Sequence, residues 1–473
     1  RGLGDVYKRQ GVGLVPCQGV YAWCGNPVSG GDGCHPSWQD MPLRADMPYE
    51  AWPSAKSSLE PSKRQGRQVT VVGVRIVSTM NPILGADMTT YQYLIVGGGM
   101  AADSAARGIR DIDKKGSIAI LSADVDAPYP RPALSKKLWT DPEFTWDQAD
   151  LATVGDTGAE LRLGTEVLSI DRDDKTVLTA SGQVFGYQKL LLVTGLTPSR
   201  IDDDGDAVLY FRSARDYQKL RALAQPGHQF VVVGGGYIGA ELAAGLVQQG
   251  CEVTLVTPDP TLGGSQFPAQ IASEYQKLFA DAGVHLVTGK RVCSVRKHEA
   301  AEVTLDDGTI LQADDVIAGL GASPVTKLAE EAGLTVNDGV IVDEQLRTND
   351  PAIWAAGDIA NYPDPVLGRT RVEHVDNAIA MGKAAGRIMA GSKDSYTHTP
   401  MMYSQIFGVR WEAVGTLDSS LATTSVEAGD GQVVYYLSDG KPVGVLLWNL
   451  PGRTDEAVTV LADPPEDLST AIS

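Results

Sequence analysis

Residues 93–102 read Tyr-Leu-Ile-Val-Gly-Gly-Gly-Met-Ala-Ala, an apolar run that breaks into glycines and continues as an alanine-rich helical pattern. The pattern predicts a strand, a tight turn and a helix, the arrangement that binds a dinucleotide. In such a turn Gly97 makes the bend, Gly99 lets the backbone approach a pyrophosphate, and Ala102 lets the helix pack closely on its strand. The N–H groups at the helix start would bind the anion.

A second glycine motif follows at the distance of one domain. Residues 230–241 read Phe-Val-Val-Val-Gly-Gly-Gly-Tyr-Ile-Gly-Ala-Glu and contain a full Gly-x-Gly-x-x-Gly. A single motif of this kind is weak, because glycine-rich strand ends are common. Two copies at domain spacing predict two nucleotide sites that face each other.

Composition limits the classes of partner. The chain has 473 residues, 43% of them hydrophobic, and a formal net charge of −19. Because phosphate groups would be repelled, we expect neither a nucleic acid nor an anionic membrane surface as partner. No apolar run reaches the roughly 18 residues that span a bilayer, and the N-terminus lacks the layout of a signal peptide. We therefore expect a cytoplasmic protein with no integral membrane segment.

The five cysteines, at positions 17, 24, 34, 251 and 293, form no Cys-x-x-Cys and lie near neither glycine motif. A flavoprotein disulfide reductase needs a close thiol pair beside its flavin to accept electrons. The spacing therefore argues against a disulfide reductase, and no metal site is predicted.

Residues 1–87 differ from the rest of the chain, with many Gly and Pro residues and little periodicity, and residues 1–10 resemble translated adapter sequence. We expect a non-native or unstructured extension before a start at Met88; a small cysteine-bearing module is the alternative. The remainder predicts an α/β fold with two Rossmann-like dinucleotide-binding domains and a small α+β C-terminal domain. The expected segments are 88–212 and 335–399 for the first domain, 213–334 for the second, and 400–473 for the C-terminal domain.

Shorter signals organise these domains internally. Asp306-Asp307-Gly308 predicts a hairpin inserted in the second domain, and Asp439-Gly440 predicts a turn between two strands of the C-terminal domain. Residues 353–358, Ile-Trp-Ala-Ala-Gly-Asp, predict a short strand that returns the chain to the first domain.

Five further motifs occur in order: Tyr129-Pro-Arg-Pro-Ala-Leu-Ser-Lys136, Ala356-Gly-Asp358, Arg371-Val-Glu-His374, Trp411-Glu-Ala-Val-Gly415 and Val443-Gly-Val-Leu-Leu-Trp-Asn449. Together with the glycine motifs they resemble the apoptosis-inducing-factor-like branch of the FAD- and NAD-dependent ferredoxin-reductase-type flavoproteins. The resemblance covers about 90–460. It implies that the first site holds FAD and the second holds NAD as NADH.

The resemblance implies the FAD contacts residue by residue. Asp358 would accept hydrogen bonds from the ribityl hydroxyls, and the helix after His374 would point at the flavin pyrimidine. Ala123 stands where the family has an acidic contact to the adenosine ribose, and the neighbouring Asp124 would substitute for it. A turn aspartate at 358 and a surface histidine at 374 are the alternatives. The expected FAD contacts are Gly97, Gly99, Met100, Ala101, Ala102, Asp124, Arg131, Lys136, Val167, Arg212, Asp358, Glu373 and His374.

For the second nucleotide, a carboxylate at Asp259 can hydrogen-bond a ribose 2′-OH and would repel a 2′-phosphate. Asp259 therefore favours NADH, although Pro258-Asp259-Pro260 also fits an ordinary turn. By resemblance, Gly321 and Pro324 lie on the nicotinamide side, and two C-terminal positions contact NAD. The expected NAD contacts are Gly234, Gly236, Tyr237, Ile238, Gly239, Asp259, Gly321, Glu412 and Asn449.

In the family, the positions of Lys136 and Glu241 form an ion pair beside the flavin and the nicotinamide, which makes them the expected catalytic residues. A lysine there stabilises reduced, electron-rich flavin, and the glutamate orients the lysine and the nicotinamide. The alternative is that Glu241, in the first turn of the helix opened by Gly239, only complements the helix dipole. Where many relatives have a tryptophan near the flavin face, this chain has Ser404 beside Tyr403.

Two classes of function stay open at this point. The first is an enzyme in which NADH reduces FAD and the electrons pass to a quinone, another small acceptor or a ferredoxin-like protein. The second is a redox-sensing interaction protein of low turnover. A ferredoxin is acidic and would prefer a basic docking face. The formal net charge of −19 gives no indication of such a face in this chain. A homodimer is a further open alternative.

Overall fold

The computed structural model describes residues 88–472, so the predictions made for 1–87 lie outside the described residues. The first domain is built on a parallel sheet in the order β3-β2-β1-β6, with β19 paired to the end of β6. Its first helix crosses from β1 to β2, as the opening motif predicts. These elements are β1 (Thr90–Val96), α1 (Met100–Ile112), β2 (Ile118–Leu121), β3 (Glu160–Arg162), β6 (Val184–Leu192) and β19 (Ile353–Ala355).

Strand β6 joins the parallel and antiparallel parts of this seven-stranded sheet, because its first half pairs antiparallel with β5 and its second half pairs parallel with β19. The chain therefore returns to the first domain after the second, as the strand predicted at 353–358 requires. Smaller elements complete this domain: η3 (Arg131–Leu134), α2 (Lys137–Thr140), η4 (Trp146–Ala149), α3 (Thr153–Thr157), β4 (Val167–Asp171), β5 (Thr176–Thr179), β18 (Val340–Ile341), η5 (Gly357–Ile359), β20 (Ala360–Asp364), β21 (Gly368–Thr370) and α8 (Val375–Met389).

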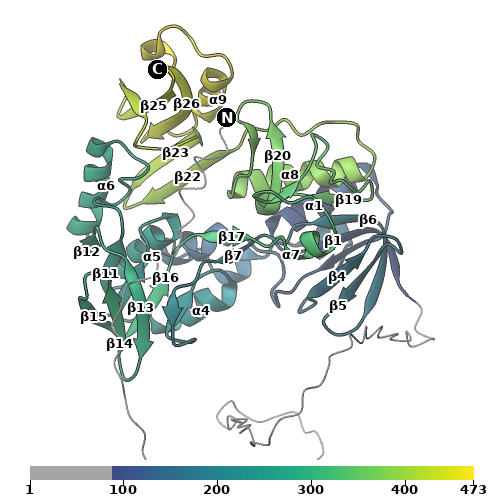
Figure 1. Cartoon of the computed structure of the whole chain (residues 1–473), viewed down its shortest axis with the longest axis horizontal. Helices are drawn as coiled ribbons and strands as arrows, with labels where there is room; N and C mark the ends of the chain where they lie inside the picture. Colours follow the sequence, from purple (N-terminus) through teal and green to yellow (C-terminus); the bar gives the residue numbers. More distant parts are fainter. Residues whose placement is uncertain (1–87, 473) are drawn as a thin grey trace, which may run out of the picture. The chain divides into compact units, whose positions relative to one another are not determined.

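Helices α1 and α8 lie side by side in the first domain (Figure 1) and touch through their backbones. A β-carbon on Gly386 would lie 2.0 Å from the Ala105 carbonyl oxygen, and one on Gly382 would lie 2.4 Å from the Ala101 carbonyl oxygen. On α1, a β-carbon on Gly108 would lie 2.1 Å from the Lys383 carbonyl oxygen. Glycine at these positions lets α8 pack against α1 close to the first glycine turn.

The second domain has a five-stranded parallel sheet in the order β12-β11-β10-β16-β9 and a smaller sheet that contains the predicted Asp307-Gly308 hairpin. Strand β9 pairs with β16 although it precedes residue 213, so this sheet begins earlier in the chain than the predicted boundary. The elements are β8 (Asp202–Asp203), β9 (Val208–Tyr210), α4 (Ala214–Leu223), β10 (Gln229–Val233), α5 (Tyr237–Gln248), β11 (Glu252–Thr257), α6 (Ala269–Asp281), β12 (His285–Thr288), β13 (Val292–Lys297), β14 (Ala301–Leu305), β15 (Ile310–Ala313) and β16 (Asp315–Ala318).

A two-stranded ribbon of β7 (Leu196–Pro198) and β17 (Ala322–Pro324) carries the chain out of the first sheet and back from the second. Helix α7 (Lys327–Glu331) follows it. No helix in residues 88–472 is long and apolar enough to cross a membrane.

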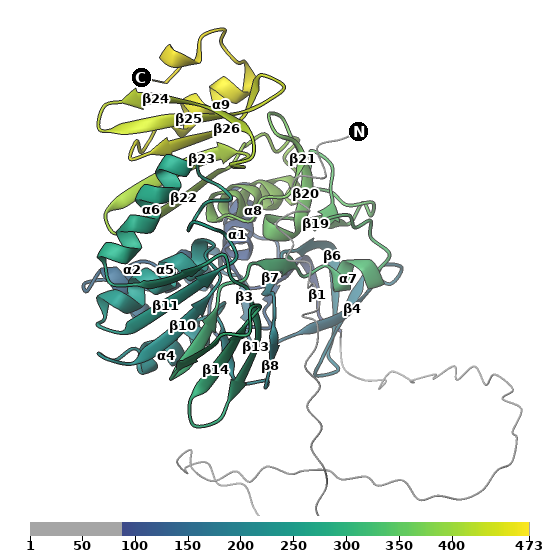
Figure 2. The same ribbon diagram turned by 60° about the vertical axis from the view of Figure 1, so that its left-hand side comes forward.

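The C-terminal domain is an antiparallel sheet in the order β22-β23-β26-β25-β24, with α9 against one face (Figure 2). The predicted Asp439-Gly440 turn joins β25 to β26. The elements are β22 (Met401–Ile406), β23 (Val409–Gly415), β24 (Ala422–Ala428), β25 (Gly431–Ser438), β26 (Lys441–Trp448), α9 (Thr454–Ala462) and η6 (Leu468–Thr470). The predicted fold class, two dinucleotide-binding domains and a small α+β domain, is confirmed.

Candidate functional site

The first glycine turn leaves the start of α1 open. Gly97 has φ +118°, and a β-carbon on it would lie 2.2 Å from the Val193 carbonyl oxygen, so only glycine fits there. Gly99 precedes α1 as its N-cap, with no side chain capping the helix. The nearest atom to a β-carbon on Gly99 is Nε of Arg131, at 4.0 Å. A 13-residue helix thus presents its N-terminus beside a guanidinium, which is an arrangement that binds an anion.

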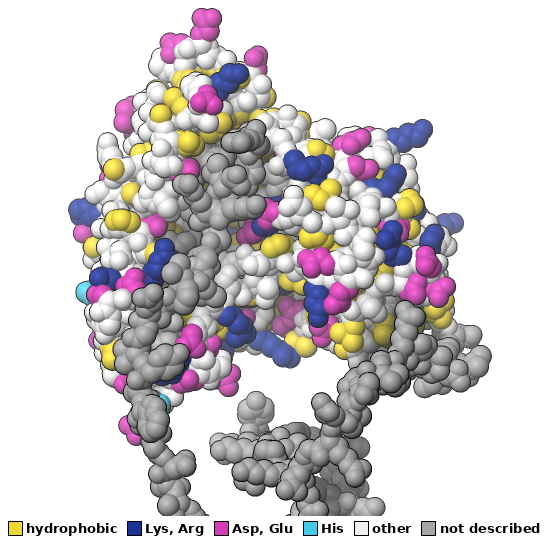
Figure 3. Space-filling view, in the orientation of Figure 1, with side chains coloured by type: hydrophobic (Ala, Val, Ile, Leu, Met, Phe, Trp, Pro, Cys, Tyr) yellow, Lys and Arg dark blue, Asp and Glu magenta, His cyan; other side chains and the backbone are white. Residues whose placement is uncertain are grey.

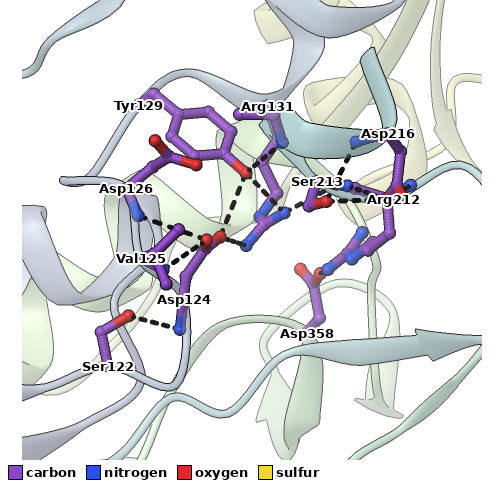
Figure 4. A network of polar contacts seen from close by, with 11 residues as sticks. Ser122, Asp124, Val125, Asp126, Tyr129, Arg131, Arg212, Ser213, Asp216 and Asp358 are labelled. Carbon is purple, nitrogen blue, oxygen red and sulfur yellow. Dashed lines mark hydrogen bonds and ion pairs between the residues drawn. The ribbon is translucent and has the colours of Figure 1, made fainter. Parts of the chain in front are cut away.

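A second guanidinium lies beside the first (Figure 4). Arg131 Nη1 donates to the backbone carbonyl of Arg212 at 2.8 Å, and the Arg212 guanidinium lies 3.7 Å from the Asp358 carboxylate. Burial, together with the neighbouring positive charge of Arg131, lowers the pKa of Arg212. Burial raises the pKa of Asp358, against the opposing effect of Arg212. Two partly buried guanidiniums beside a helix N-terminus favour a further negative charge.

Asp124 lies at the other end of the same network (Figure 4). Its Oδ2 accepts a hydrogen bond from the Tyr129 hydroxyl at 3.3 Å and lies 3.8 Å from Arg131 Nη2. The Asp124 carbonyl accepts from the Gly164 N–H at 2.8 Å, so the segment that leads into Val167 runs next to Asp124. The structure therefore brings the four predicted contacts Asp124, Arg131, Arg212 and Asp358 into one network, with Val167 near its end.

These residues fit FAD. The open turn at Gly99 and the paired guanidiniums suit a pyrophosphate, and Asp358, which follows Gly357 at φ +69°, suits hydroxyl groups on the side of α8. Gly357 also closes against α1, because a β-carbon on it would lie 3.1 Å from the Ala101 β-carbon. The individual contact roles stay predictions.

His374 is the N-cap of α8, and its environment keeps it neutral. Burial, together with the nearby Lys136 charge, lowers the pKa of His374 to about 4. Its Nδ1 lies 3.4 Å from the Asp376 N–H, and its Nε2 lies 3.3 Å from the Tyr403 N–H. A neutral ring accepts at only one of these nitrogens. Glu373, which was predicted as an FAD contact, accepts from Arg371 Nη1 at 2.5 Å, so it is held beside the start of α8.

The second glycine turn repeats the first. Gly234 has φ +103°, and a β-carbon on it would lie 2.4 Å from the Gly319 carbonyl oxygen. Gly236 is the N-cap of α5 and faces open space, whereas a β-carbon on Gly239 would lie 1.9 Å from the Gly234 carbonyl oxygen. Tyr237 and Ile238 are exposed at this helix start. The open N-terminus of a 12-residue helix fits the pyrophosphate of NAD.

Asp259 follows the end of β11, beside this turn. Its Oδ2 accepts from the Ser265 hydroxyl at 2.8 Å, and within residues 88–472 its Oδ1 has no hydrogen-bond partner. Gly321, with φ +79°, lies between β16 and β17 and accepts from the Ser199 N–H at 3.0 Å. The position of Asp259 fits a ribose hydroxyl, as predicted for NADH.

We expect Asp259→Ala to lower kcat/KM for NADH by roughly 10-fold, because a hydrogen bond to a charged group is lost. The value for NADPH should fall less, and the FAD content should stay the same, since Asp259 lies on the other nucleotide domain. The matched control is Asp281→Ala, which removes a charge from the exposed end of α6 in the same domain. Equal use of NADPH by the unmutated protein would contradict the role of Asp259.

Lys136 and Glu241 meet, although they come from different domains. Lys136 Nζ lies 2.5 Å from Glu241 Oε1, and Glu241 is only 3% exposed. The Ser135 hydroxyl donates to Glu241 Oε2 at 2.6 Å. One part of the prediction is wrong: α5 begins at Tyr237, so Glu241 lies in the second turn and not in the first. Its distance from the helix start weakens the helix-dipole explanation.

Arg410 was not predicted and organises the C-terminal side of the site. Its guanidinium donates to Glu412 Oε1 at 2.6 Å, and its backbone N–H donates to Asn449 Oδ1 at 3.2 Å. Its guanidinium lies 4.9 Å from the centre of the Tyr403 ring, and Lys136 Nζ lies 5.5 Å from the same centre. Both predicted contacts, Glu412 and Asn449, thus bond to Arg410, Glu412 to its guanidinium and Asn449 to its backbone.

Comparisons with known proteins agree with this geometry. Residues 91–382 match the family described as pyridine nucleotide-disulphide oxidoreductase. The chain is 32% identical to monodehydroascorbate reductase 3 of Arabidopsis thaliana over 80% of this chain and 93% of that protein. It is 33% identical to the peroxisomal monodehydroascorbate reductase 4 of the same plant, over 76% of this chain and 79% of that protein.

Solved structures place the chain among electron-transfer reductases. Putidaredoxin reductase in its covalent complex with putidaredoxin superposes with a TM-score of 0.73 at 28% identity, over 79% of this chain and 93% of that chain. A ferredoxin reductase from Rhodopseudomonas palustris gives 0.72 at 27% identity, over 81% of this chain and 100% of that chain. The predicted resemblance is confirmed: the chain belongs to the pyridine nucleotide-disulphide oxidoreductase family and is an FAD-dependent oxidoreductase that uses NADH.

Proposed function

We propose that this oxidoreductase reduces a small anionic organic radical of the monodehydroascorbate type. The observation that carries the proposal is the wall of the site formed by Tyr403, with Lys136 Nζ at 5.5 Å and Arg410 at 4.9 Å from the ring centre. An aromatic ring with two cations close to it suits a small, flat anion.

The relatives support the same acceptor. Reductases named for monodehydroascorbate match over 93% of their own length in the Arabidopsis thaliana example. A ferredoxin-like protein is the other candidate, because putidaredoxin reductase is solved in complex with putidaredoxin. The chain carries a net charge of −19, and on the face shown in Figure 3 acidic and basic side chains are interspersed. This favours a small acceptor over an acidic protein, which would prefer a basic docking face.

The reaction balances with two acceptor molecules. NADH loses one hydride, which carries two electrons, and each organic radical takes one electron and one proton, so one further proton comes from solvent. FAD, when bound, supplies the conversion from a two-electron donor to one-electron acceptors. Lys136 and Arg410 would hold the anion beside the flavin site, and Glu241 would fix Lys136.

The test compares acceptors at saturating NADH. Turnover is followed by NADH absorbance with monodehydroascorbate generated by ascorbate oxidase, with a neutral quinone, and with a ferredoxin-type iron–sulfur protein. We expect the highest kcat/KM for the radical anion and a fall in that value with ionic strength, which the neutral quinone should not show. Faster turnover with the iron–sulfur protein would overturn the proposal. Slow turnover with all three, together with a long-lived NADH-reduced protein, would favour the redox-sensing alternative.

A cytoplasmic location and a homodimer stay predictions.

A further inference from the structure

The β22–β23 hairpin of the C-terminal domain contacts the catalytic end of α5 at two points. Ser404 and Trp411 are directly opposite each other in the hairpin, so their side chains point to the same face. Tyr237 and Glu241 are four residues apart on α5, so they also share a face. Ser404 Oγ donates to Glu241 Oε1 at 2.7 Å, and the Trp411 ring centre lies 5.4 Å from that of Tyr237.

The buried Glu241 carboxylate depends on these contacts. Its Oε2 accepts from Ser135, and its Oε1 accepts from Ser404 as well as from Lys136. Ser404 is 1% exposed, so water cannot readily replace its hydroxyl. Without Ser404, Oε1 would keep only the Lys136 ammonium among the described residues. A single partner on a flexible stem fixes a carboxylate less well than two partners do.

The residues come from three different parts of the chain. Lys136 and Ser135 follow η3 of the first domain, Glu241 belongs to α5 of the second, and Ser404 belongs to β22 of the C-terminal domain. The hydrogen bond from Ser404 brings the C-terminal domain, which contains neither glycine motif, into contact with Glu241.

We propose that Ser404 is a positioning residue for the transfer of hydride from NADH. It holds Glu241 Oε1 so that Lys136 is kept in place beside the nucleotide sites, and the Trp411–Tyr237 contact holds the same face of α5 one turn earlier. The C-terminal domain thereby sets the geometry of the Lys136–Glu241 pair. The inference concerns the reduction of FAD and is independent of which acceptor follows.

The test is stopped-flow reduction of the holoenzyme by NADH. Ser404→Ala should lower the limiting rate of FAD reduction by about 10-fold, because it removes one hydrogen bond to a charged group and loosens the pair. The apparent Kd for NADH should change by less than about 2-fold, since Ser404 acts on orientation and not on binding. An unchanged limiting rate, or a loss confined to the Kd, would overturn the proposal.

The matched control is Ser419→Ala. The Ser419 hydroxyl donates to the Gly264 carbonyl at 2.6 Å, so it also links the C-terminal and second domains, but away from Glu241. Both variants are also unfolded thermally without FAD, a readout that does not depend on catalysis. We expect similar small losses of thermal midpoint in the two variants and a slower FAD reduction only in Ser404→Ala. Equal slowing in both variants would show a general effect of domain linkage and would overturn the proposal.

A double-mutant cycle shows whether Ser404 acts through Glu241. In the Glu241→Ala background the hydroxyl has no carboxylate to hold, so adding Ser404→Ala should lower the limiting rate less than about 2-fold further. An undiminished 10-fold loss in that background would contradict a positioning role.

Discussion

Gly386→Ala is expected to lower the thermal midpoint of the protein by roughly 10 °C and to cause loss of FAD during purification. The added β-carbon would lie 2.0 Å from the Ala105 carbonyl oxygen, and the contact is with backbone, which cannot rotate away. Helices α1 and α8 must therefore separate, at a cost of about 3 kcal/mol or more. Because a loss of 1 kcal/mol lowers the midpoint of a domain of this size by about 2–4 °C, the shift should be plain in calorimetry.

The loss of FAD has its own reason in the same geometry. Gly382, one turn earlier on α8, packs against the Ala101 backbone at the start of α1. Separation of the helices therefore moves the predicted pyrophosphate site relative to Asp358, which precedes α8. FAD content is measured from the ratio of flavin to protein absorbance.

Gly155→Ala is the matched control for Gly386→Ala. Gly155 lies in α3 of the same domain, and a β-carbon on it would meet nothing within 4 Å. This substitution should leave the FAD content unchanged and should not destabilise the protein, because alanine is the better helix former. A normal midpoint and full FAD content in Gly386→Ala would show that the two helices tolerate separation.

The sequence predicts those parts of the fold whose signals are local. The glycine turns at Gly97 and Gly234 and the Asp-Gly hairpins lie where their motifs place them, since each turn is specified by a few adjacent residues. The crossing of α1 and α8 was not predicted, because Gly382 and Gly386 have no signature without a partner helix. The place of β9 in the second sheet was not predicted for a similar reason, since it depends on a pairing with β16 far along the chain.

The candidate site also has a part that could be predicted from the sequence and a part that could not. The meeting of Lys136 and Glu241 follows from the family resemblance, whereas the roles of Ser404 and Arg410 depend on the register of one hairpin. A signal for that register was present, because Phe407-Gly408 forms the turn and Ile406 pairs with Val409 across it. Counting back from that turn places Ser404 opposite Trp411. Only the structure shows that α5 lies against this face of the hairpin.

Glu241→Ala is expected to slow the reduction of FAD by NADH by roughly 100-fold. The substitution leaves the Lys136 ammonium without its carboxylate and leaves the Ser135 and Ser404 hydroxyls without their acceptor. Misplacement of reacting groups by about 1 Å costs a factor of this size. The rate is measured by stopped-flow absorbance of the flavin under anaerobic conditions. The FAD content should stay near normal, because the groups that fit the pyrophosphate lie on α1 and Arg131.

Lys136→Ala tests the other half of the pair and should change two measured quantities, a rate and a reduction potential. It should slow the reduction of FAD, and it should lower the reduction potential of the flavin, because a cation in the site stabilises the electron-rich reduced form. Glu241→Ala should shift the potential less, since Lys136 keeps its charge in that variant. The potential is measured by equilibration with reference dyes. An unchanged potential in Lys136→Ala would mean that the ammonium does not act on the flavin.

The double variant decides whether the two residues work as one unit. If Glu241 acts by holding Lys136, then removing Lys136 first leaves Glu241 with no cation to hold, and the second substitution should cost much less than about 100-fold. Strict additivity of the two rate losses would mean that the residues act independently. Their contact at 2.5 Å would then be a structural link between the first and second domains, and the catalytic assignment of the pair would have to be abandoned.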